Sequence, residues 1–177
     1  MSLIALIAPV MLAASGPVAW PAPLADFRDG ALLCDNPDDA RKICSSLRTV
    51  TSDGKGGWIM RELRIMDREA DIVLEASAHL FIQDGQFCHK IDLSQVPTFR
   101  FWQHGILASP ALHQKMVAMT KAQIAVIANK TFCYELARTN DQLIRRGRMY
   151  DGATFKIALP AQPARLVQAK QGYRVAP

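Results

Sequence analysis

The sequence predicts an α+β fold, in which antiparallel strands pack with one short N-terminal helix and one longer central amphipathic helix. Hydrophobic and polar residues alternate with period two over residues 72–83, and Asp84-Gly85 follows as a two-residue hairpin turn. After Ser109-Pro110 the apolar residues recur at helical spacing instead. With 50% hydrophobic and 21% charged residues, the 177-residue chain is not expected to be disordered.

The N-terminal segment predicts export. Residues 3–14 form an uninterrupted apolar run, and the first charged side chain is Asp26. A signal peptide has an apolar region of this length, whereas a membrane-spanning helix needs about 20 apolar residues. We therefore expect residues 1–25 to be a signal peptide cleaved within 14–25, and residues 26–177 to form one secreted or periplasmic domain without a transmembrane helix. An uncleaved membrane anchor is the alternative.

The four cysteines, Cys34, Cys44, Cys88 and Cys133, predict two disulfide bonds in an oxidising compartment. Three pairings are formally open. The segment 36–39, Asn-Pro-Asp-Asp, has the residues of a helix start, and a short helix to about Cys44 would bring Cys44 back to Cys34. This favours the pairs 34–44 and 88–133. No C-x-x-C occurs, so neither a metal site nor redox catalysis is predicted.

The other elements follow in chain order. A glycine-rich loop at residues 53–57 separates strands expected at 46–52 and 58–66. In the hairpin that starts at Ile72, Ile82 should face Phe87, with one face of the hairpin in the core. The second half predicts a helix of about eighteen residues that ends near Asn129, then strands at 131–138, 143–150 and 153–159, with breaks at Pro160 and Pro163. A duplication into two helix-plus-meander halves is an alternative interpretation.

No catalytic residues are assigned from the sequence. Glu75, Ser77 and His79 have the residue types of a hydrolytic triad, but on a strand Glu75 and His79 lie about 13 Å apart. The mature chain contains no nucleophile elbow, zinc-protease or nucleotide-binding motif, so no cofactor is predicted. An enzymatic function is therefore the less favoured hypothesis.

An aromatic connector at residues 99–105 supplies a candidate pocket formed by His104, Trp102 and Phe101. The favoured interpretation is that the same aromatic cluster belongs to the hydrophobic core and fills the space between the two halves. His89 falls on the core face of the hairpin, opposite Leu80, where a histidine is more often structural than a ligand.

The charge is unevenly distributed. Residues 26–93 carry a net charge of −4, and residues 94–177 carry +9. Six basic residues of the second half form the candidate basic surface: Arg138, Arg145, Arg146, Arg148, Lys156 and Arg165. Such a surface predicts an anionic envelope component or an acidic protein as partner, and export argues against nucleic acid. A solvated basic face without a partner is the alternative.

Together these features predict an exported, non-enzymatic binding or envelope-associated protein of bacterial type. A hydrolase-like enzyme that uses His104 or His79 in a small pocket is one alternative. An inhibitor of a secreted enzyme, presenting the loop 53–57, is another.

Overall fold

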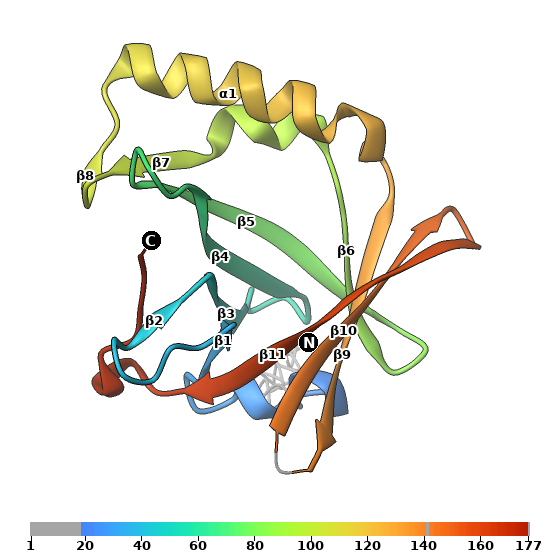
Figure 1. The fold of residues 1–177 in the computed structure, drawn as a ribbon. Coiled ribbons are helices and arrows are strands. Elements are labelled where there is room, and N and C mark those ends of the chain that lie inside the picture. Colours follow the sequence, from blue (N-terminus) through green and yellow to red (C-terminus); the bar gives the residue numbers. More distant parts are fainter. Residues whose placement is uncertain (1–18, 141, 177) are drawn as a thin grey trace, which may run out of the picture.

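The computed structural model describes residues 19–140 and 142–176, and it corrects the expected fold class. The chain is not an α+β packing of helices on a sheet. It is mostly β-structure, with a closed, eight-stranded antiparallel β-barrel and a single long helical segment in the described ranges (Figure 1). The apolar run at residues 3–14, on which the signal peptide rests, lies outside the described residues.

The barrel strands follow the order β4-β3-β1-β11-β10-β9-β6-β5, and β5 closes the ring by pairing with β4. Their bounds are β1 Leu32–Asp35, β3 Ser46–Ser52, β4 Trp58–Asp67, β5 Ile72–Gln83, β6 Gln86–Lys90, β9 Thr131–Thr139, β10 Gln142–Asp151 and β11 Thr154–Val167. An eight-stranded barrel has an interior just wide enough to be filled by side chains or to hold one small ligand.

The β5–β6 hairpin forms as predicted. Asp84 and Gly85 take φ values of 49° and 73°, the positive angles that a type I′ turn requires, and Ile82 pairs with Phe87. The pairing is shorter than expected because β6 leaves β5 after Phe81 and Cys88 and continues along β9.

One edge of β5 is only partly paired. Strand β6 pairs with residues 81–83 and β7 (Arg100–Gln103) with residues 72–75, and within the described ranges no strand pairs with this edge between them. Beyond β7 lies the short strand β8 (Ile106–Leu107). The helical segments η2 (Leu93–Thr98), α1 (Pro110–Ile124) and η3 (Ala125–Ile127) lie across this end of the barrel (Figure 1).

The central helix forms where the sequence predicts it. The Ser109 hydroxyl accepts a hydrogen bond from the Leu112 N–H at 3.4 Å, and Asn129 follows the helix at a φ of 62°. Met116 is buried against β5 and β7, whereas Met119, one turn further along the helix, is 43% exposed. In the part of the chain that the structure describes, no helix has both the length and the apolar content to cross a bilayer.

The prediction of a short N-terminal helix from residue 36 to Cys44 is wrong. Asn36 and Lys42 have φ values of 48° and 55°, and the residues between them form turns that lead into β2 (Ile43–Cys44). Asp38 uses its side chain to accept the Arg41 N–H at 3.1 Å. The helix-start residues therefore build a loop instead, and β2 pairs in parallel with β12 (Arg174–Val175).

The expected layout of two helix-plus-meander halves is also wrong, because strands of both halves form a single closed barrel, joined through β11. Strand β11 pairs with β10 on one side and with β1 on the other. This strand continues through both prolines that were expected to end it. Pro160 lies at a register shift opposite Arg146, and a bulge tolerates a residue without an N–H.

Both disulfides join the cysteines that the sequence favoured. Cys34–Cys44 and Cys88–Cys133 lie on the outside of the barrel wall, and no free cysteine occurs in the described residues. At the end opposite α1, the 3₁₀ helix η1 (Ala22–Phe27) places Leu24 and Phe27, both fully buried, into the barrel core (Figure 1).

Candidate functional site

The middle of the barrel contains a buried cluster of charged side chains. Because side chains alternate between the two faces of a strand, Asp35 points inward with Leu33, and Arg48 with Val50. Arg145 reaches the same place from β10, where its Nε donates to Asp35 Oδ1 at 2.9 Å. Arg48 donates to Asp35 Oδ2, which also accepts from the Ser46 hydroxyl at 2.6 Å.

Each arginine has a second acceptor. Arg48 Nη2 donates to Glu62 Oε1 at 2.7 Å, and Arg145 donates to Gln162. Burial alone would raise the pKa of Asp35, but the charges of Arg48 and Arg145 outweigh this effect and hold that pKa below its ordinary value. The pKa of Glu62 is likewise lowered by Arg48 despite burial. We call these four residues, Asp35, Arg48, Glu62 and Arg145, the charged floor; two carboxylates and two guanidinium groups give it no net charge.

Tyr134 packs against the charged floor. The centre of its ring lies 4.8 Å from Arg145 Cζ and 5.9 Å from Arg48 Cζ, within the range of cation–π contacts. Gly147 pairs with Tyr134 across β9 and β10, and a Cβ atom at position 147 would lie only 2.9 Å from Tyr134 Cε1. The absence of a side chain at Gly147 therefore allows the ring to lie against the wall.

A cavity of about 160 Å³ separates the charged floor from α1. Arg48 and Glu62 line it from the charged floor, Tyr134 lines it next to the floor, and Thr120, Ile124 and Ile127 line it from the helical cover. Its wall is mainly apolar and includes Met60, Leu74, Ala76, Ala78, Ile91 and Phe132. The cavity also runs along the unpaired stretch of β5, since Ala76, Ser77 and Ala78 line it.

Two residues that line this cavity each carry a buried polar atom without a hydrogen-bond partner. These atoms are His89 Nδ1 and Thr120 Oγ1, and among the residues described no other buried side-chain nitrogen or oxygen atom lacks a partner. His89 is 9% exposed and Thr120 3%, and both side chains line the cavity. Unpaired buried polar atoms are rare in folded proteins, because each carries an uncompensated desolvation cost.

His89 is held in place by aromatic stacking. Its ring lies 6.0 Å from Phe132 and 5.8 Å from Tyr134, nearly parallel to both. Burial lowers the pKa of His89 to about 4, so its imidazole is neutral at pH 7. One ring nitrogen of a neutral imidazole is a donor and the other an acceptor, so His89 can serve a ligand in either role according to its tautomer.

The structure does not bring together the three residues of the candidate pocket. Phe101 is fully buried under α1, while Trp102 points to the opposite face of β7 and donates to Glu75 Oε2 at 2.9 Å. His104 lies in the β7–β8 turn, where its side chain is 67% exposed and its Nδ1 lies 3.4 Å from Asp71 Oδ2. His79 is exposed on the outside of β5, as the strand alternation predicts.

The six residues of the candidate basic surface occupy different places. Arg145 is buried in the charged floor, and Arg146 faces Glu135 at 3.8 Å on the outside of the wall. The exposed residues Arg148 and Lys156 lie on the β10–β11 hairpin. Arg138 and Arg165 line a groove formed by β10, β11 and the loop at residues 36–39 together with Asp39, which forms an ion pair with Arg165 at 2.9 Å.

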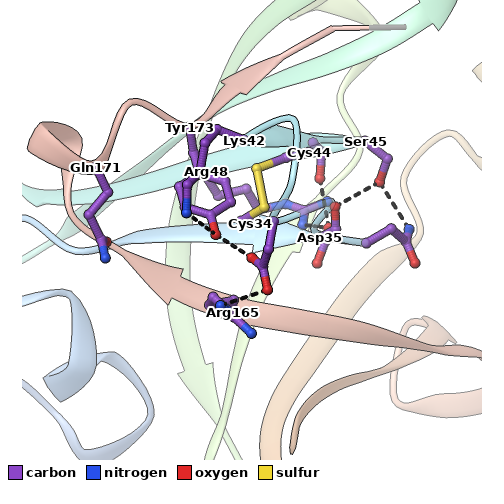
Figure 2. Close-up of a disulfide and its surroundings, with 12 residues drawn as sticks. Cys34, Asp35, Lys42, Cys44, Ser45, Arg48, Arg165, Gln171 and Tyr173 are labelled. Carbon is purple, nitrogen blue, oxygen red and sulfur yellow. Dashed lines mark hydrogen bonds and ion pairs between the residues drawn. A yellow bond between two sulfur atoms is a disulfide. The ribbon is translucent and has the colours of Figure 1, made fainter.

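The disulfide Cys34–Cys44 anchors the C-terminal end of β1. Figure 2 shows Cys34–Cys44 next to Tyr173, whose hydroxyl donates to Asp39, and Ser45, whose hydroxyl donates to the Asp35 carbonyl at 3.1 Å. Cys34 and Asp35 are consecutive, so the disulfide lies outside the wall while the Asp35 carboxylate lies inside it. This anchoring fixes the strand that carries the central carboxylate of the charged floor.

Sequence reasoning missed most of this site. It placed His89 on the core face but did not find Asp35, Arg48, Glu62 or Thr120. The available signal was a charged residue at an inward position, such as Arg48 two residues before Val50 or Glu62 two residues after Met60. In the described ranges, no group of three or more histidine, cysteine, aspartate or glutamate side chains is placed to hold a metal ion.

Fold and site define a class of molecule: a small antiparallel barrel with an internal cavity above a neutralised charged floor. Comparison of the chain with protein-family models, curated proteins and solved structures found no match.

Proposed function

We propose that this protein is an exported, non-enzymatic binding protein that holds one small molecule in the barrel cavity. The observation that carries the proposal is the cavity itself, which combines an apolar wall with two unpartnered polar atoms, His89 Nδ1 and Thr120 Oγ1. Ligand sites are typically concave, mostly apolar and supplied with a few polar groups that orient the ligand.

Binding is favoured over catalysis by the way the charged groups are used. The Asp35 carboxylate and the Arg48 guanidinium face each other in the floor, and Glu62 and Arg145 are also engaged. A reaction would need a charged or nucleophilic group free to act on a substrate. The groups of the floor instead stabilise the barrel beneath the ligand.

Export is supported by the two disulfides, which persist in oxidising compartments. A periplasmic or extracellular location is part of the proposal. An anionic envelope component or an acidic protein as an additional partner stays a prediction, for which Arg148 and Lys156 on the β10–β11 hairpin are two of the exposed candidates.

The proposal is tested with purified protein by two-dimensional amide NMR during titration with phenol, toluene and benzoate. Binding in the cavity should shift the amide signals of Ala76, His89 and Thr120. Ala76→Leu should abolish these shifts because the larger side chain fills the cavity, whereas Ala158→Leu on the exposed part of β11 should leave them unchanged. If none of the three probes shifts these signals in the unaltered protein, the proposal is wrong.

A further inference from the structure

The charges of the floor leave little opportunity for a charged ligand. The two carboxylates and two guanidinium groups are paired with one another, and a ligand charge brought down to them would break these pairs. A buried charge without a partner is strongly unfavourable. The electrostatics of the floor therefore favour a ligand without net charge.

The two buried polar atoms without a partner belong to uncharged side chains. His89 is uncharged at neutral pH, and the Thr120 hydroxyl can both donate and accept. The two side chains come from different elements of the cavity lining, His89 from β6 in the wall and Thr120 from α1 in the cover. A hydroxyl group on a ligand has the same dual capacity, so it can donate to one partner and accept from the other.

The cavity volume limits the rest of the ligand. An engineered protein cavity of about 150 Å³ with an apolar lining holds one benzene molecule. The volume here is about 160 Å³, and its wall includes Phe132 and Ile124, which suit an apolar ring. A single ring or an aliphatic group of similar size is therefore the largest body that the cavity accepts without expansion.

From these three constraints we infer that the ligand is an uncharged molecule of single-ring size that carries a hydroxyl group, and that His89 and Thr120 bind this hydroxyl. The inference rests on the proposed function and specifies the chemical class of the ligand. His89 and Thr120 become specificity-determining residues, whereas the charged floor has a structural role.

The rim of the cavity supplies the contrasting hypothesis. Arg64 and Lys90 line the cavity and are exposed, with Asp92 nearby in the lining. An anionic ligand could place its charge at these rim residues in contact with water and leave only its apolar part inside. Such a ligand would not depend on His89 or Thr120.

The same three probes discriminate between these binding modes. Phenol is uncharged at pH 7 and has the hydroxyl, toluene lacks it, and benzoate is an anion at this pH. In the wild-type protein, phenol should bind at least tenfold more tightly than benzoate, and more tightly than toluene. Thr120→Val and His89→Phe retain the shape of each side chain but remove its polar atom, so each should lower the ratio of phenol to toluene affinity about tenfold.

Arg64→Gln is the matched control, since it changes the rim and should leave the phenol-to-toluene ratio unchanged. Far-UV circular dichroism and unfolding midpoints confirm that each variant is folded. Toluene binding as tightly as phenol, or an unchanged ratio in both cavity variants, would overturn the inference while leaving the proposed function intact. The inference would also be overturned if benzoate bound most tightly and Arg64→Gln removed this preference. The ligand would then be an anion whose charge lies at the rim.

Discussion

Asp35 and Arg145 are 110 residues apart in the chain and meet inside the barrel, where Arg145 Nε donates to Asp35 Oδ1 at 2.9 Å. The pair connects β1 with β10 across the intervening strand β11. Asp35 also accepts from Arg48, so one carboxylate holds two guanidinium groups. Removing its charge leaves two buried cations with incomplete compensation.

Asp35→Asn should therefore destabilise the protein by about 3–5 kcal/mol, the usual effect of breaking a buried ion pair from one side. Urea unfolding followed by circular dichroism measures this free energy. Asp38→Asn, which alters the exposed Asp38–Arg41 pair, is the matched control and should leave the unfolding midpoint nearly unchanged. Equal effects of the two substitutions would contradict the central role of Asp35.

Stability should fall between pH 6.5 and pH 4 because of His89. Its pKa is 6.5 in the unfolded chain and about 4 in the barrel, so between these values the unfolded state binds more protons and is favoured as the pH decreases. The loss amounts to about 3 kcal/mol in total. His89→Phe should remove this pH dependence and His79→Gln, on the outer face, should retain it; a persistent slope in His89→Phe would exclude His89 as its source.

Below this range a second loss of stability should begin. The pKa values of Asp35 and Glu62 lie below their ordinary values of 3.8 and 4.5 in the folded protein, so their contributions are present above those values and disappear as the pH falls through the lowered pKa values. Unfolding midpoints measured from pH 5 down to pH 2 should show this loss in wild-type protein. A smaller acid dependence is expected in Asp35→Asn, and an unchanged one would argue against the assignment.

Thr120→Val should leave stability unchanged or increase it by about 1 kcal/mol, because it replaces an unpartnered buried hydroxyl with a methyl group of similar size. Thr98→Val should not stabilise, since the Thr98 hydroxyl donates to the Gln95 carbonyl at 2.7 Å. Thermal unfolding of both variants provides the comparison. Marked destabilisation by Thr120→Val would show that its hydroxyl has a partner in the free protein.

The two disulfides should differ in their contribution to stability. Cys88–Cys133 closes a loop with a sequence separation of 45 and Cys34–Cys44 one of 10, so the chain-entropy model assigns them about 4 and about 3 kcal/mol. Paired Cys→Ala variants, compared by urea unfolding under non-reducing conditions, measure both values. A greater loss from the 34–44 pair would show that its contacts with Tyr173 and the fastening of β1 outweigh loop length.

Signal-peptide cleavage should occur before Trp20. Leu24 is fully buried in the barrel core, and the Trp20 ring lies 4.2 Å from the ring of Trp58. Cleavage later in the expected 14–25 window would remove these contacts and expose the core. Mass spectrometry of the mature protein identifies its first residue, and a chain that begins at Asp26 should unfold at a lower urea concentration than one that retains Trp20.

Local sequence signals predicted local structure well. Asp84-Gly85 placed the β5–β6 turn because these two residues tolerate positive φ, and Ser109-Pro110 placed the start of α1. The signals at residues 36–39 failed because pairing of β2 with β12 and the Cys34–Cys44 bond acted on the same segment. Residues 36–39 do have the types that favour a helix start, but these tertiary contacts determined the structure of the segment.

Barrel closure and the candidate site depend on pairs that are distant in sequence. Leu32 on β1 pairs with Val167 on β11, and no local pattern specifies that choice. The charged floor likewise combines Asp35 with Arg145, whose position among three nearby arginines suggested a surface role. Strand alternation directs Arg145 opposite to Arg146 and Arg148, but without the barrel it does not show which of the two directions is inward.

The interrupted edge of β5 has a kinetic consequence. Between β6 and β7, the cavity is covered by side chains from α1 and η2 rather than by a hydrogen-bonded neighbouring strand. Lifting a packed helix breaks no interstrand hydrogen bonds, whereas parting two strands of the wall would break several. Exchange of a bound molecule with solvent is thus expected to proceed beneath α1, at a rate set by how firmly Met116 anchors this helix and independent of the global unfolding rate.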